Sequence, residues 1–384
     1  MVTRSTDGLF KFEDCLLKHH IRTEAWLPLC KKRLQNIRAT SRPRVRRLRY
    51  FTFCAVGAID VLMLDVAKVI TRSDIGKFDT VFFFDRKPEL VIETQKRIPG
   101  AIGFPSDFVG TVLLNDPDDE CLEDGEDPLI SPEIQPDELK TRRSQLQCAE
   151  RKRFIRSFPF DVINLDLEEF LFKPNDEFPG KMVKVLRKIF AWQQRKLVIS
   201  GRETQVLDGF TLMFTTQIGP PNLSADYLKM LQDALQENLM MNGALKPILI
   251  KRTETDDVEL LQNSRFDIFF KLAMPKLLAA ILMEQDWYID TKTGIRIFEF
   301  ERPSNTGSYK ILHLVMDVKR KNPPKDKRAP GRDSPEAQEA YRSVVRKIFV
   351  EGENVITEAS IDKLRLQKNL EQIKARRRKY CPDE

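Results

Sequence analysis

Residues 50–70 read YFTFCAVGAIDVLMLDVAKVI, and this stretch decides the fold. Residues 50–54 are rich in aromatic side chains and are typical of a buried strand. A turn is predicted at 55–58, and 59–70 predicts a helix that is apolar on most of its faces. A buried strand followed at once by a buried helix is the opening unit of an α/β sheet.

The same alternation continues along the chain. Pro88 falls in the first turn of a predicted helix, where its missing N–H removes no helical hydrogen bond. The later predicted strands are 80–84, 101–104, 160–166 and 210–216, and the predicted helices are 88–97, 136–156 and 180–195. Because these strands are apolar almost without interruption, we expect a parallel sheet that helices cover on both faces.

Two further strands, 297–300 and 309–318, are joined by a short turn with Pro, Asn and Gly, so we expect them to be antiparallel. The predicted fold class is a doubly wound, mostly parallel, Rossmann-like α/β sheet with a terminal antiparallel strand pair and helical extensions at both ends. The predicted division of the chain is a helical and basic N-terminal extension at 1–44, an α/β domain at 45–320, and a basic linker with a C-terminal helix at 321–384.

The two extensions carry most of the basic runs. Apolar residues at helical spacing in 1–38 predict two short helices, and 359–379 predicts a helix that ends in four consecutive basic residues. Between residues 31 and 49, nine of nineteen side chains are Lys or Arg and none is acidic. Residues 319–332 hold seven basic residues and three prolines, which predicts an extended linker.

Composition narrows the function classes. The 384 residues include 64 Lys and Arg against 57 Asp and Glu, a net charge of +7, which mildly favours a polyanionic partner. Six cysteines form no CxxC pair and only three histidines exist, so neither a zinc ribbon nor a disulfide framework fits. The sequence lacks GxSxG, GxxxxGK[ST] and GxGxxG motifs, which disfavours a serine hydrolase, a P-loop NTPase and a nicotinamide enzyme. We expect a reduced, cytoplasmic protein without a membrane span.

An acidic stretch interrupts the predicted α/β domain. Eight of the fourteen residues in 115–128 are Asp or Glu, with no Lys or Arg. A solvated loop is the simpler interpretation, and a metal-binding loop is the alternative. The spacing does not match an EF-hand, so we predict no metal.

Polar side chains follow the predicted strands at their carboxyl ends, where doubly wound sheets bind ligands. An acid after the second strand, Asp85, can accept hydrogen bonds from ribose hydroxyls, and Asp107 after the third can meet an adenine amino group. Asn164 and Asp166, at the end of the fourth strand, are expected to face the part of the ligand that reacts. The competing interpretations are structural: Asp85 caps the next helix, Asp107 is a loop acid and Asp166 merely ends a strand. His313 is expected to be a half-buried strand residue.

At these positions the chain resembles the class I S-adenosylmethionine-dependent methyltransferases, most closely the tRNA guanine N2-dimethyltransferases. Residues 53–59 (FCAVGAI) are similar to the family's Ser-Ala-x-Gly turn, and 84–89 (FDRKPE) to its second strand end. Residues 161–169 (DVINLDLEE) resemble its Asp-Val-Ile-x-x-Asp-Pro-Phe/Tyr-Gly motif, and 214–217 (FTTQ) its Thr-Ala-Thr ending. The resemblance covers about half the chain.

The resemblance implies S-adenosylmethionine as cofactor and transfer of its methyl group to the amine of a nucleic-acid base, with no metal. The residues it implies for cofactor binding are Thr52, Cys54, Ala55, Gly57, Asp85, Arg86 and Asp107. The residues it implies for catalysis are Asn164 and Asp166.

Two departures from the family pattern keep a second function open. Gly57 is the only glycine of the first turn, where the family has two or three for close approach to the cofactor. Leu167 and Glu168 replace the Pro-aromatic pair that helps to hold a target base. The alternative is therefore a catalytically inactive, methyltransferase-like binding or assembly subunit of a multi-component system.

The basic runs predict RNA or DNA as a partner, since Lys and Arg bind phosphates and release counterions. A solvated surface is the alternative, and a protein partner in an assembly stays open. The residues predicted to bind nucleic acid are Arg44, Arg46, Arg47 and Arg49.

Overall fold

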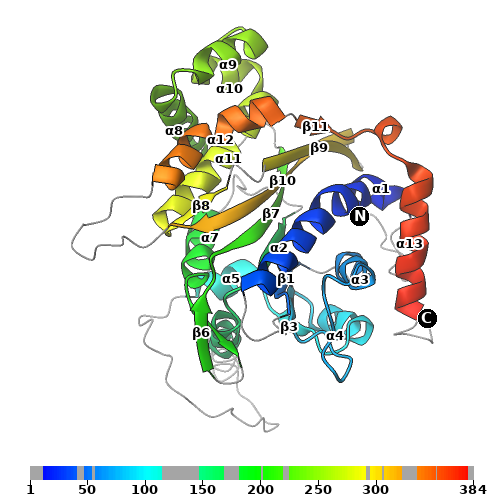
Figure 1. Ribbon diagram of the computed structural model, residues 1–384. Helices are drawn as coiled ribbons and strands as arrows, with labels where there is room; N and C mark the ends of the chain where they lie inside the picture. Colours follow the sequence, from blue (N-terminus) through cyan, green and yellow to red (C-terminus); the bar gives the residue numbers. More distant parts are fainter. Residues whose placement is uncertain are drawn as a thin grey trace, which may run out of the picture.

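A computed structural model of the protein describes residues 12–40, 47–53, 57–114, 147–167, 181–199, 202–218, 225–290, 295–304, 307–321, 335–351 and 353–378 (Figure 1). Within these ranges the chain forms an α/β fold, with helices on both faces of one mixed sheet. The expected fold class is confirmed, and the helix predicted at 88–97 has the bounds found for α4 (Pro88–Arg97).

The described residues contribute nine strands to the main sheet, in the order β3-β2-β1-β4-β7-β10-β9-β11, with β8 beside β10. The strands are β1 (Tyr50–Thr52), β2 (Val81–Asp85), β3 (Ile102–Pro105), β4 (Val162–Asp166), β7 (Gly209–Ile218), β8 (Trp287–Ile289), β9 (Ile295–Ser304), β10 (Gly307–Arg320) and β11 (Glu353–Val355). The five strands from β3 to β7 are parallel. The order reverses between β1 and β4, the position at which open α/β sheets bind ligands.

Strand β10 runs against both of its long neighbours. It pairs antiparallel with β7 on one side and with β9 on the other, so the predicted antiparallel pair is confirmed. Strand β11 then adds to β9 in the parallel sense. A separate hairpin, β5 (Lys196–Ile199) with β6 (Arg202–Val206), stands outside this sheet.

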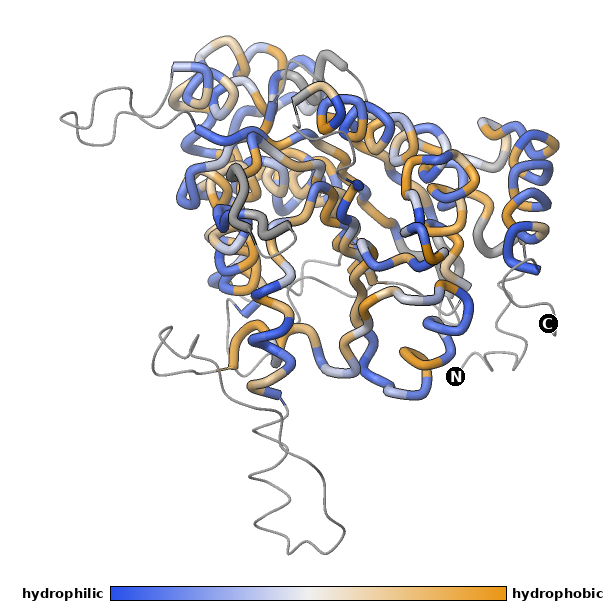
Figure 2. Tube along the Cα trace, turned by 60° about the horizontal axis from the view of Figure 1, so that its bottom comes forward, coloured by the Kyte–Doolittle hydropathy of each residue, from blue (hydrophilic) through white to orange (hydrophobic). Residues whose placement is uncertain are grey.

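The helices form two layers, one on each face of the sheet (Figure 1). The first layer packs on the face of Tyr50, Val81 and Phe83, and the second packs on the face of Phe51 and Phe82. The first layer holds α1 (Phe12–Ile21), η1 (Arg22–Trp26), α2 (Leu27–Thr40), α3 (Ile59–Val66), α4 and α13 (Lys363–Arg378). The second holds α5 (Phe108–Leu113), α7 (Lys181–Trp192), α8 (Ala225–Met241), α9 (Leu245–Thr253), α10 (Val258–Ser264), α11 (Phe266–Glu284) and α12 (Pro335–Glu351). Figure 2 shows the hydrophobic segments along the central strands between these layers.

The N-terminal segment differs from the two short helices expected. Residues 12–40 are helical throughout, and α1 and α2 are joined by one π-helical turn, η1. Pro28 explains the wide turn, because proline has no N–H to donate and its ring crowds the carbonyl four residues earlier. That carbonyl belongs to Glu24, and it accepts a hydrogen bond from Arg296 Nη1 at 2.7 Å instead.

Several described elements were not predicted from the sequence: α8 to α11, the β5–β6 hairpin, β8, α12 and β11. Helices α8 to α11 fill the connection between β7 and β8, and β11 extends the sheet. The C-terminal elements join the same body, since α12 packs on α11 and α13 packs on α3 (Figure 1).

The acidic stretch 115–128 and residues 322–332 of the predicted linker 319–332 lie outside the described residues. In the described helices, none is long and apolar enough to cross a membrane.

Candidate functional site

The carboxyl ends of β2 and β3 bring three predicted residues together. Arg86 Nε donates to Asp107 Oδ1 at 2.7 Å, and β2 lies directly beside β3. The other oxygen of Asp107 accepts the N–H of Gly110 at 2.7 Å and so caps α5. Asp85 Oδ1 accepts the N–H of Lys87 at 2.9 Å, just before α4 begins. Both carboxylates thus have local structural roles, yet Asp85 Oδ2 has no partner in the described part of the chain.

The end of β1 is tied to β4 and α3 by a buried hydrogen-bond network. Thr52 Oγ1 and the Tyr50 hydroxyl both donate to Asp60 Oδ2, at 3.0 and 2.9 Å. Asn164 Nδ2 donates to the Tyr50 hydroxyl at 3.0 Å and to Thr52 Oγ1 at 3.2 Å. Burial, and then the charge of Asp60, hold the pKa of Tyr50 well above its ordinary value. Two predicted site residues, Thr52 and Asn164, therefore share one network.

The turn after β1 leads into α3 without a capping side chain. Gly57 is buried, and Ala58 has φ of 45°, in the left-handed region, directly before Ile59 begins the helix. Alanine has no side-chain oxygen, so the first N–H groups of α3 receive no side-chain cap. Cys54 and Ala55, also predicted for this turn, lie outside the described residues.

The carboxyl end of β4 is covered by the N-terminal helix. Lys18 Nζ lies 2.5 Å from Asp166 Oδ2. Burial raises the pKa of Asp166, but Lys18, Arg22 and His313 together outweigh it and hold the pKa below its ordinary value. Asp166 is therefore an ionised carboxylate, and its principal contact comes from a helix to which the sequence had assigned no site role.

Beside Asp166 lies a buried histidine that joins three elements. Trp26 Nε1 donates to His313 Nε2 at 2.5 Å, and His313 Nδ1 lies 2.6 Å from Thr215 Oγ1. Because an indole N–H only donates, Nε2 accepts and the ring proton is on Nδ1, which donates to Thr215. Burial lowers the pKa of His313 to about 3, so the ring is neutral at neutral pH. The expectation of a half-buried residue was wrong: His313 is 2% exposed, because η1 covers β10 there.

Several polar atoms in this region are buried without hydrogen-bond partners. Within the described chain they are Arg22 Nε and Nη1, both ring nitrogens of His19, Asn164 Oδ1 and Asp166 Oδ1. Arg22 lies against the ring of Trp26, with its guanidinium carbon 5.6 Å from the ring centroid. Buried polar groups in folded proteins are nearly always paired with protein, water or ligand. We name this set, with Lys18, Trp26, Thr215 and His313, the β4-end cluster.

Two of the arginines predicted to bind nucleic acid have internal partners. Arg49 Nε donates to the carbonyl of Pro159 at 3.0 Å, and its guanidinium carbon lies 4.8 Å from the Phe82 ring centroid. Arg47 forms a two-point ion pair with Asp79, in which Nη2 donates to Oδ2 at 2.7 Å. Both side chains therefore lie at the amino ends of the parallel strands, at the edge of the sheet opposite Asp85 and Asp166. Arg44 and Arg46 lie outside the described residues.

No candidate metal site occurs among the described residues, in the sense of three or more His, Cys, Asp or Glu side chains gathered together. The chain matches no protein-family model, and no curated protein sequence is significantly similar to it.

Proposed function

We propose that the protein binds S-adenosylmethionine at the carboxyl edge of the sheet and transfers its methyl group to an amine, most simply that of a nucleic-acid base. One observation carries this proposal: the strand order reverses at β1 and β4, and the strand-end carboxylates of Asp85, Asp107 and Asp166 follow the parallel strands at that edge. The antiparallel strand β10 beside β9 also suits the end of a methyltransferase sheet.

The described residues fit the chemical groups of such a cofactor. Asp85 Oδ2 is available to accept ribose hydroxyl hydrogen bonds beside the uncapped start of α3. The unpartnered N–H groups of Arg22 suit a carboxylate, and a zwitterionic amino acid carries one. The unpartnered oxygens of Asn164 and Asp166 suit the N–H groups of an amine.

When bound, S-adenosylmethionine would supply an electrophilic methyl group and be left as S-adenosylhomocysteine, and the acceptor nitrogen would release its proton to solvent. This reaction depends chiefly on positioning. We assign that positioning to Asn164 and Asp166 and the exclusion of water to α1 and η1, which cover them.

A second candidate is a binding subunit that does no chemistry. The ion pair between Lys18 and Asp166 favours it, because this pair already occupies one oxygen of the carboxylate that would orient the acceptor. Leu167 also favours the binding subunit, since the methyltransferase family that the chain resembles has proline at this position.

An assay with radiolabelled S-adenosylmethionine and mixed RNA and DNA separates the two candidates. We expect wild type to transfer methyl groups and Asp166→Asn to lose turnover while its cofactor affinity stays within a few-fold, since positioning acts on the transition state. Asparagine is chosen because alanine would open space beside Lys18 at a largely buried position. A silent wild type that still binds its partners would instead establish the binding subunit.

A further inference from the structure

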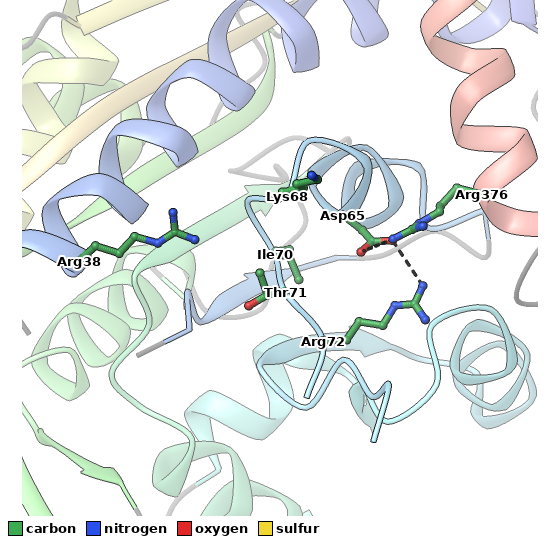
Figure 3. Close-up of a pocket in the computed structure, with 7 residues that line it drawn as sticks. All are labelled: Arg38, Asp65, Lys68, Ile70, Thr71, Arg72 and Arg376. Carbon is green, nitrogen blue, oxygen red and sulfur yellow. Dashed lines mark hydrogen bonds and ion pairs between the residues drawn. The ribbon is translucent and has the colours of Figure 1, made fainter. Parts of the chain in front are cut away.

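A basic pocket of about 430 Å³ lies away from the carboxyl edge, beyond the C-terminal end of α3 (Figure 3). Helix α3 has eight residues, so its two ends are about 12 Å apart. The pocket brings together three segments distant in sequence: the last turn of α2, the end of α3 with the loop that follows, and α13. Its lining residues are Arg38, Asp65, Lys68, Ile70, Thr71, Arg72 and Arg376.

The lining carries an excess of positive charge. Four side chains are cationic and one, Asp65, is anionic. Arg376 Nε donates to Asp65 Oδ2 at 2.7 Å, and Arg72 Nη2 lies 3.6 Å from the same oxygen. One buried carboxylate therefore holds two guanidinium groups in place at the pocket. The result is a preorganised positive site.

Two further cations and a hydroxyl are available at the pocket. Arg38, Lys68 and the Thr71 hydroxyl have no hydrogen-bond or ion-pair partner among the described residues, and Figure 3 shows their side chains around the same space. Backbone hydrogen bonds fix the loop that carries Lys68. The N–H of Lys68 donates to the carbonyl of Asp65 at 2.9 Å, and the N–H of Ile70 donates to the carbonyl of Leu64 at 3.2 Å. Lys68 and Thr71 therefore lie on a loop whose backbone conformation is fixed.

We propose that this pocket binds a phosphate group, carried by a nucleotide or by a nucleic-acid chain. Guanidinium, ammonium and hydroxyl groups are all donors to phosphate oxygens, and the single carboxylate is already engaged by arginines. The volume is in the range of small-molecule sites, about 300–1,000 Å³, so the pocket has room for a phosphate together with the sugar attached to it. The inference does not rest on cofactor binding at the other end of α3.

The test compares four fluorescent probes on the full chain: a nucleoside, its 5′-monophosphate, and one oligonucleotide with either a 5′-phosphate or a 5′-hydroxyl. The variant Arg38→Gln/Lys68→Gln removes the two cations without partners, so the Asp65 ion pairs stay intact. The matched control, Lys229→Gln/Lys251→Gln, removes two exposed positive charges on α8 and α9. We expect the pocket variant to weaken phosphate-bearing probes at least ten-fold and the control to change them less than two-fold.

The probes also identify the source of the phosphate. Tight binding of the monophosphate alone indicates a free nucleotide, a preference for the 5′-phosphorylated oligonucleotide indicates a chain end, and equal binding of both oligonucleotides indicates internal phosphates. The proposal is overturned if wild type binds none of the phosphate probes, if the nucleoside binds as well as its monophosphate, or if pocket and control variants weaken binding equally.

Discussion

His313 shows how much one side chain depends on residues far away in the sequence. Its ring is fixed between Trp26 on η1 and Thr215 on β7, and these contacts set its tautomer. No local pattern in the strand YKILHLVMDV indicates either partner, because one is 287 residues away and the other 98. The sequence predicted that His313 lies in a half-buried strand, but not that η1 would cover it.

Thr215→Val tests the contribution of the hydrogen bond between Thr215 and His313. Valine keeps the shape of threonine but leaves His313 Nδ1–H buried without an acceptor, which should cost about 1–3 kcal/mol of unfolding free energy. The matched control is Thr216→Val, since Thr216 is also buried but makes only a 3.4 Å bond to the carbonyl of Gln217. Urea denaturation should show a loss for Thr216→Val less than half as large, and equal losses would contradict this contribution.

We expect the free energy of unfolding to fall in acid because two histidines are buried in the folded protein. Burial lowers the pKa of both His19 and His313 from 6.5 to about 3, and Arg22 adds to the effect at His19. Between those pH values the unfolded chain binds protons that the folded chain does not, so stability falls as pH falls below 6.5. Each histidine contributes at most about 1.4 kcal/mol per pH unit.

His19→Leu should flatten this dependence. Leucine cannot titrate, and it replaces a ring whose two nitrogens have no described partner. The stability lost between pH 6 and pH 5 should be smaller by about 1 kcal/mol than in wild type. Denaturation curves at pH 7, 6 and 5 measure it, and parallel curves for variant and wild type would show that His19 is already protonated in the folded state.

Among the elements, helix boundaries followed sequence signals where those signals were local. Pro88 marked the start of α4, and Asp107 caps α5 as a strand-end aspartate can. The π-helical turn η1 was missed because Pro28 was not expected to lie inside one continuous helix. That turn matters for the site, since it carries Arg22 and Trp26 into the β4-end cluster.

Glu254→Gly should stabilise the protein at the end of α9. Glu254 is exposed and has φ of 66°, a left-handed conformation that costs a residue with a Cβ about 1 kcal/mol relative to glycine. The same change at Glu259, in the first turn of α10, should destabilise by about 1 kcal/mol because glycine weakens helices. Thermal or urea unfolding distinguishes the two, and a loss of stability at Glu254 would contradict the strain argument.

In the whole molecule, the alternation of apolar strands and helices was enough to predict the parallel half of the sheet. Periodicity does not encode which distant segments meet, so the joining of α13 to α3 and of β11 to β9 could not be foreseen. The same limit applies to function. Asp85, Asp107 and Asp166 were predicted as site residues from their places at strand ends, whereas the contacts of Lys18 and Arg22 and the basic pocket arise only from packing.

The most direct test of the account is calorimetry of the full chain with S-adenosylmethionine and S-adenosylhomocysteine. We predict that wild type binds both and that Asp85→Ala weakens binding by about 1.5–3 kcal/mol, the loss expected for a hydrogen bond to a charged group. Asp74→Ala, an exposed aspartate beyond the opposite end of α3, should bind as wild type does. Absence of binding by a folded wild type, or equal binding by Asp85→Ala, would contradict a cofactor site at this edge of the sheet.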